Sequence, residues 1–259
     1  SMGLSFKDIA PFLSAGQNKW SRRLSYIGLG VGVLLLLCSV QLFININKLL
    51  KEKNPSKNGF DYLSVTKTIT NENMASDHSF NDEDIAALKK NPVIDDATPL
   101  IANKFLLKAT GGTVLPFTTD LFLEAIDNSF IDSIPPSFVW QQGQDIVPII
   151  ISSDYLELYN TVFAPSQGLP QVSAKSVSSV MVQLQCYSAS GSIKNFRASI
   201  VGLSDRINSV LVPINFLQWA NQQLGSSVKT NPSRIFIKTK DANNPDLLSF
   251  LQQKNYSIN

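Results

Sequence analysis

The chain has 259 residues, and its 22 Lys and Arg against 20 Asp and Glu leave a formal net charge of +2. A charge so close to neutral gives no positive field that would hold nucleic acid, so we expect no nucleic-acid partner. Its two cysteines and single histidine cannot supply a disulfide framework or the ligand spacing of a structural zinc site. We therefore expect neither a metal nor another cofactor.

Residues 1–23 are short, basic and partly amphipathic. Four apolar side chains share one helical face, namely Phe6, Ile9, Phe12 and Leu13. Trp20, Arg22 and Arg23 follow, and these residue types are typical of the headgroup level of a membrane. We interpret the segment as cytoplasmic and in contact with membrane lipid. A disordered tail remains the alternative, because Pro11 interrupts the helical pattern.

No charged residue occurs between Leu24 and Asn47. About 20 mostly apolar residues suffice to cross the hydrocarbon layer, and an isolated span must be helical to satisfy its own backbone. We therefore predict a transmembrane helix over residues 24–47, which is too long an apolar run for a cleaved signal peptide. Gly28 and Gly32 are spaced for close helix packing, although ordinary small residues in a span explain them equally well.

A polar linker is predicted over residues 48–59, and a globular domain over residues 60–259. Basic residues are equally numerous on the two sides of the span, so their count does not set its orientation. Long domains cross largely regardless of charge, while a short basic N-terminus stays inside. We expect the N-terminus in the cytoplasm and the large domain in the periplasm, on the outer side of a bacterial inner membrane.

Strand and helix patterns in the large domain are mixed without regular alternation, which predicts an α+β fold with two lobes. The strands are expected at residues 62–70, 93–101, 104–109, 121–126, 146–151, 177–185, 192–203, 209–212, 234–238 and 256–258. The helices are expected at residues 82–90, 154–163, 213–224 and 245–253, with a loop over residues 164–172. Asn81 or Asp82 is the candidate cap of the first helix, and Ser153 or Asp154 that of the second.

Motifs of catalytic sites are missing from the sequence. There is no G-x-S-x-G turn, P-loop or G-x-G-x-x-G motif outside the apolar span. The only histidine, His78, lies in a polar stretch read as a loop, and a membrane-anchored hydrolase would have to use it. Asp127 and Asp132 are interpreted as solvated loop acids rather than a catalytic pair. We expect that the chain is not an enzyme.

An aromatic stretch of the second predicted helix is a candidate surface for a partner. Its residues are Tyr155, Tyr159 and Phe163, and polar residues lie between them. The alternative is that this stretch is the packed end of a helix.

Three stretches resemble the MacB/FtsX-type ABC transporter permeases, and the resemblance covers essentially the whole chain. They are NDEDIAALKKNPVIDDATPL (81–100), VPIIISSDYLELYNTVFA (147–164) and FRASIVGLSDRINSVLVPINFLQWAN (196–221). The resemblance implies a MacB-like periplasmic core domain with a mixed α/β lobe and a more β-rich lobe. It also implies three further membrane spans, a separate cytoplasmic ABC ATPase, and a homo- or hetero-dimer of permease subunits.

By this resemblance, ATP hydrolysis in the partner would move the periplasmic lobes, for export or for mechanotransmission to a periplasmic protein or lipoprotein. Mechanical coupling needs packing surfaces rather than reactive side chains, which fits the missing catalytic motifs. The alternative is a one-span, membrane-anchored periplasmic interaction or sensor domain that works without an ATPase.

Overall fold

The computed structural model describes residues 59–111, 115–178, 181–226 and 231–258. Three sets of predicted residues lie outside these ranges. They are the predicted membrane-interface residues Trp20, Arg22 and Arg23, the predicted span 24–47 with Gly28 and Gly32, and nearly all of the predicted linker 48–59. Within these ranges, every helix is too short or too polar to cross a bilayer.

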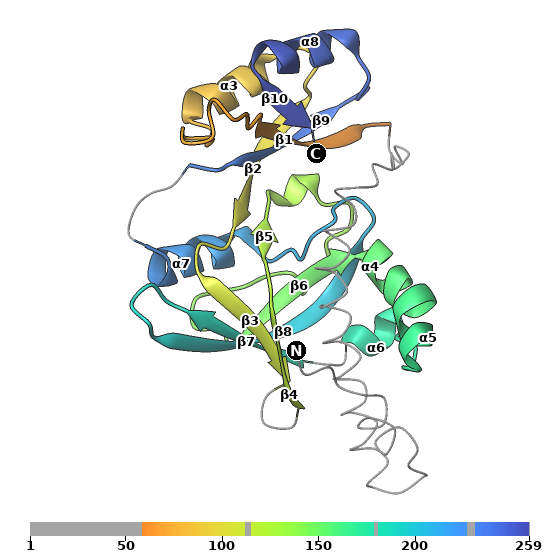
Figure 1. Ribbon diagram of the computed structural model, residues 1–259. Helices are drawn as coiled ribbons and strands as arrows, with labels where there is room; N and C mark the ends of the chain where they lie inside the picture. Colours follow the sequence, from red (N-terminus) through yellow and green to blue (C-terminus); the bar gives the residue numbers. More distant parts are fainter. Residues whose placement is uncertain (1–58, 112–114, 179–180, 227–230, 259) are drawn as a thin grey trace, which may run out of the picture.

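The first lobe is an antiparallel sheet with two helices on one face (Figure 1). Its strands run in the order β10-β1-β9-β2-β5. They are β1 (Asp61–Lys67), β2 (Asp96–Ala102), β5 (Glu124–Ala125), β9 (Arg234–Thr239) and β10 (Tyr256–Ile258). The two helices are α3 (Asp82–Lys90) and α8 (Pro245–Gln253). The first and last strands of the described chain, β1 and β10, are therefore neighbours.

Alternation along the strands divides the first lobe into two apolar faces. Val65 and Ile235 point toward the helices and pack in a fully buried cluster with Leu88 and Leu247. The intervening residues, such as Phe236, point to the opposite face and join a different cluster. Since side chains of a strand alternate between faces, a sheet with apolar residues on both faces must be covered on both. The second lobe covers the face that the helices leave open.

The second lobe is a mixed sheet in the order β4-β3-β7-β8-β6. Its strands are β3 (Leu106–Gly111), β4 (Leu115–Asp120), β6 (Ile146–Ser152), β7 (Met181–Tyr187) and β8 (Ile193–Ser204). Only β6 and β8 pair in parallel; the other pairs are antiparallel. The helical segments are η1 (Asn128–Phe130), α4 (Ser153–Leu158), the π-helical turn η2 (Tyr159–Phe163), α5 (Ala164–Gln167), α6 (Ala174–Ser178) and α7 (Ile214–Leu224).

The α+β architecture with two lobes is confirmed, and so are most of its elements. The cap of α3 is also as predicted: the Asn81 side chain accepts from the Asp84 N–H, and the Asp84 carboxylate accepts from the Asn81 N–H. Three elements differ from prediction at their ends. Ser152, and not Ser153 or Asp154, caps α4; the predicted loop 164–172 begins as helix α5; and residues 174–178 form α6 before β7 starts at Met181.

Two strand predictions were wrong. The predicted strand 121–126 is reduced to β5, while β4 was not predicted at all. Pro116 lowered the strand signal of β4, and an edge strand tolerates proline because one of its sides needs no N–H donors. The predicted strand 209–212 does not form a regular strand. Only Leu211 pairs there, through isolated bridges to Glu124 and Ile150.

Candidate functional site

The two lobes meet at an apolar contact, here called the seam. It comprises Leu100, Ile126, Phe130, Ile131, Phe138, Ile150, Ile207, Leu211 and Phe236, all buried. Leu100 and Phe236 belong to first-lobe strands, whereas Ile150 belongs to β6 of the second lobe. The rings of Phe130 and Phe236 meet edge to face at 5.9 Å between centroids. The seam thus has the packing of a domain core although it joins two sheets.

A chain of backbone hydrogen bonds crosses the seam. The short strand β5 pairs with β2 through Ala102 and Glu124. On its other side, the Glu124 N–H donates to the Val210 carbonyl (2.9 Å), and the Val212 N–H donates to the Glu124 carbonyl (3.0 Å). Leu211 and Ile150 of β6 then exchange two bonds of 2.7 and 2.9 Å. The 210–212 segment therefore connects the two sheets through their main chains.

An ion pair stands beside this crossing. Arg234 of β9 donates to the Glu124 carboxylate at 2.8 Å and to the Ser64 hydroxyl at 3.2 Å. Burial raises the pKa of Glu124, and the Arg234 guanidinium opposes that shift without cancelling it. The Glu124 side chain is only 18% exposed, and a carboxylate so poorly hydrated depends on its cation, so Arg234 fixes the place of β5 relative to β9.

A second arginine reaches across from the other lobe. The guanidinium carbon of Arg206, which follows β8, lies 3.9 Å from the ring centroid of Tyr62 on β1. The same side chain donates to the Phe130 carbonyl at 2.9 Å. Its turn is held by Ser204, which donates to Asp132 at 2.6 Å, while the Asp205 N–H donates to the same carboxylate at 3.0 Å. Asp132 is thus a structural acid of the seam.

The predicted partner surface is largely inside the protein, which corrects that hypothesis. Tyr155 and Tyr159 have no exposed area and belong to the core of the second lobe, and Phe163 packs partly buried against it. Burial raises the pKa of Tyr159 to about 12 and also raises that of Tyr155. The stretch mixes aromatic and polar residues, and such a mixture occurs both at the packed end of a helix and on a contact surface. The sequence alone could therefore not distinguish these two alternatives.

The remaining candidates have local roles. Asp127 caps η1: its carboxylate accepts from the Ser129 hydroxyl and N–H, and these bonds lower the pKa of Asp127. His78 lies in the loop between β1 and α3, as predicted. Among the residues that the structure covers, no group of three or more His, Cys, Asp or Glu side chains is placed to hold a metal ion.

Sequence reasoning missed the residues of the seam that carry charge. Arg234 and Glu124 are 110 positions apart, and Arg206 and Phe130 are 76 apart. Neither pair belongs to a motif of fixed spacing. The available signal was a charged residue directly before an apolar run, since Arg234 precedes Ile235, Phe236 and Ile237.

Comparison with known proteins gives two family matches. The family described as a probable transporter periplasmic core domain matches residues 63–259, and that described as a probable transporter N-terminal domain matches residues 12–54. No protein with a curated description matches the chain.

Two solved structures align with most of the chain at low identity. One is the extracellular domain of the ABC-type transporter YknZ from Gram-positive bacteria, with 15% identity, 77% of this chain and 100% of that chain covered, and a TM-score of 0.37. The other is the periplasmic region of MacB from Actinobacillus actinomycetemcomitans, with 14% identity, 78% and 92% covered, and a TM-score of 0.36.

Proposed function

We propose that this chain, which belongs to the family of probable transporter periplasmic core domains, is a permease subunit of an ABC transporter. In this proposal an ATPase subunit on the cytoplasmic side of a bacterial inner membrane drives it. ATP hydrolysis there changes the conformation of the periplasmic domain. The single observation that carries the proposal is the family match over residues 63–259.

The path of such a movement follows from the order of the elements. The predicted span 24–47 is joined by residues 48–59 to β1, so a displaced span acts first on the first lobe. Twelve linker residues reach at most about 40 Å when fully extended. From β1 the displacement passes through β9 and β2 to β5, and across the 210–212 segment to β6. Main-chain bonds and the seam give this path its stiffness.

The proposal assigns the domain a mechanical role and no catalytic one. The subunit works as a homo- or hetero-dimer, and its periplasmic partner is a protein or lipoprotein. The ion pair between Arg234 and Glu124 beside the seam joins β9 to β5, which suits a domain that transmits movement. These points support a role in export or in mechanotransmission.

Affinity capture of the full native protein from bacterial membranes tests the proposal. Mass spectrometry of the captured complex is expected to find a P-loop ATPase in stoichiometric amount, and ATP hydrolysis by the complex should depend on the permease. Recovery of periplasmic partners alone, with no ATPase, would contradict the proposal. It would leave a membrane-anchored interaction or sensor domain.

A further inference from the structure

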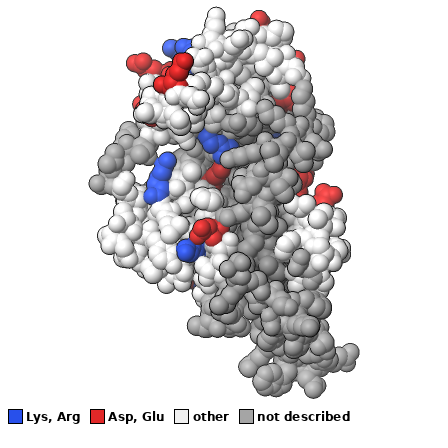
Figure 2. All heavy atoms as spheres, viewed as in Figure 1, with Lys and Arg blue, Asp and Glu red and all other residues white. Residues whose placement is uncertain are grey.

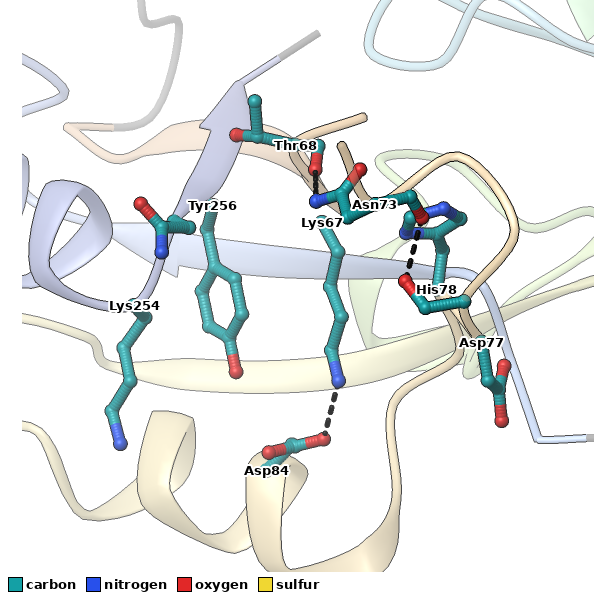
Figure 3. Close-up of a pocket in the computed structure, with 10 residues that line it drawn as sticks. Lys67, Thr68, Asn73, Asp77, His78, Asp84, Lys254 and Tyr256 are labelled. Atoms are coloured by element: carbon teal, nitrogen blue, oxygen red, sulfur yellow. Dashed lines mark hydrogen bonds and ion pairs between the residues drawn. The ribbon is translucent and has the colours of Figure 1, made fainter. Parts of the chain in front are cut away.

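A polar pocket lies in the first lobe, between the loop that follows β1 and the turn between α8 and β10 (Figure 3). Its volume is about 240 Å³, and its walls include Lys67, Asn73, His78, Asp84, Lys254 and Tyr256. Sites for drug-sized ligands generally begin at about 300 Å³. This pocket therefore fits a smaller group.

The walls of the pocket are held in place by their own hydrogen bonds. Asn73 accepts from the Thr70 N–H at 2.7 Å and donates to the Thr68 carbonyl at 3.0 Å, which ties the loop to the end of β1. On the opposite wall, Asn255 takes the left-handed conformation with φ of 57°, which turns the chain from α8 into β10. These contacts fix the shape of both walls of the pocket.

The charges of the pocket are not all paired. Lys67 donates to Asp84 at 3.1 Å, and the same carboxylate oxygen accepts from the Asn81 N–H at 3.0 Å. Lys254 has no ion pair within the described residues. Its side chain extends in the same direction as that of Lys67 (Figure 3). Asp77, at the rim, is exposed and accepts from the Ser79 N–H. Lys254 is exposed to solvent and lines the pocket, so its ammonium group is accessible to a ligand that enters there.

Tyr256 stands beside this cation as a second donor. It is the register partner of Lys67 across the β1–β10 pair, and its hydroxyl has no hydrogen-bond partner within the described ranges. Burial, and next the Asp84 carboxylate, raise the pKa of Tyr256 to about 12, so the phenol keeps its proton at neutral pH. An ammonium group and a phenol O–H both require an acceptor.

Two further features bear on the kind of ligand. The Nε2 atom of His78 is buried and has no hydrogen-bond partner in the part of the chain that the structure describes, so the pocket wall holds a buried polar atom that a ligand could satisfy. Ile69 and Met74, on the same loop, are each 64% exposed. A polar pocket beside exposed apolar side chains is suited to an amphiphile.

We propose that the pocket binds a phosphate group, to whose oxygens Lys254 and Tyr256 donate. Anionic oxygens accept from charged donors in short, strong hydrogen bonds, and a phosphate offers several acceptors at once. The phosphate belongs either to a phospholipid headgroup, whose acyl chains would contact Ile69 and Met74, or to a soluble phosphate compound. This binding is independent of the proposed ATPase coupling and would stand if no ATPase were found.

The test uses the full 259-residue chain in a phosphate-free detergent, titrated with inorganic phosphate and with dihexanoyl phosphatidylglycerol, and followed by ³¹P NMR. We expect saturable binding that Lys254→Met and Tyr256→Phe each weaken about tenfold, the loss typical of one charge-assisted hydrogen bond. Lys240→Met is the matched control, since Lys240 is an exposed lysine of the same lobe that does not line the pocket. Thermal unfolding verifies that each variant is folded.

The outcomes answer two questions: whether the pocket binds phosphate, and whether that phosphate belongs to a lipid or to a soluble compound. Absence of binding by both probes, unchanged binding in Lys254→Met, or an equal loss in Lys240→Met would overturn the proposal. Tighter binding of the lipid that is lost in the Ile69→Ser/Met74→Ser double variant identifies a lipid headgroup. Equal affinity for both probes, with the same dependence on Lys254, identifies a site for soluble phosphate compounds.

Discussion

Asp84 connects two elements through a single carboxylate. It closes the capping box at the start of α3 and pairs with Lys67 at the end of β1. Burial acts to raise the pKa of Asp84, but the Asn81 N–H and the Lys67 ammonium outweigh burial and lower it below its ordinary value of 3.8. The charged form is therefore the one that stabilises the folded lobe.

A depressed pKa makes this stabilisation dependent on pH. It is fully present above the ordinary pKa of an aspartate and is lost as pH falls through the depressed value. We expect Asp84→Asn to lower the free energy of unfolding by about 1 kcal/mol at pH 7, and the difference from wild type to shrink below about pH 4. Urea unfolding at several pH values measures it. Glu83→Gln, a neighbour with no ion pair among the described residues, is the control, and a difference that persists at low pH would refute this reading.

Cys186 is a buried thiol of β7, and burial raises its pKa to about 12 although Lys194 opposes the shift. Thiolates and not thiols react with alkylating reagents. In a Cys38→Ser background we therefore expect iodoacetamide at pH 8 to modify the folded protein at least about 1,000-fold more slowly than the urea-unfolded chain. Mass spectrometry over time measures both rates; comparable rates would show that β7 opens readily.

At the scale of elements, much of the fold could be predicted because its signals are local. Helix α3 has its cap, its acids and its lysines within the sequence Asn81–Lys90, and α8 begins at Pro245 as predicted. The seam could not be predicted, because Arg234, Glu124 and Arg206 gain their partners only when distant segments meet. The 210–212 segment illustrates the difference: its apolar residues indicated a strand, but not that Leu211 would connect two sheets.

The Arg234–Glu124 ion pair joins two strands, β9 and β5, and its contribution to stability can be tested by removing the arginine. Arg234→Met leaves Glu124 buried without its partner, which raises the pKa of that carboxyl further. We expect a loss of about 2 kcal/mol in the free energy of unfolding at pH 7, below the full value for buried pairs because the Arg234 side chain is 40% exposed.

In the wild-type protein the ionised Glu124 costs stability, whereas the ionised Asp84 adds to it, but the loss caused by either substitution diminishes at low pH. A carboxyl with a raised pKa costs stability when ionised, so the loss in Arg234→Met should diminish as pH falls through the raised value and Glu124 gains its proton. Arg197→Met is the matched control. Its partner is Asp145, the two side chains are 50% and 56% exposed, and the expected effect is below about 0.5 kcal/mol. A loss that is equal at pH 5 and pH 7 would contradict the role assigned to Glu124.

For the whole molecule, the family comparison confirms the resemblance that the sequence indicated. It does so at the level of a probable transporter's periplasmic core domain, preceded by a probable transporter N-terminal domain. On the face shown in Figure 2, the Lys, Arg, Asp and Glu side chains of the described residues are scattered. The family could be inferred from three stretches that resemble it, because no motif of fixed spacing in the sequence indicated a site.

Two separate cores predict that the lobes respond separately to damage. Leu247 is fully buried in the first-lobe cluster and Leu184 in that of the second lobe. Each substitution to alanine should cost about 3 kcal/mol and speed amide hydrogen exchange mainly in its own lobe. Hydrogen exchange followed by mass spectrometry locates the effect. If both variants loosened both lobes equally, the domain would be one cooperative unit and the seam would not be a boundary.

The pairing of β2 with β9 has a consequence for how such a domain is assembled. Leu100 and Arg234 are register partners on these neighbouring strands, so the chain leaves the first lobe and returns to it at adjacent points. The second lobe, together with the short strand β5, is thus an insertion into what would otherwise be a β-hairpin. A different insert could be grafted at the same two positions if it also covered the face of the sheet that carries Phe236, because the core under the two helices belongs to the first lobe alone.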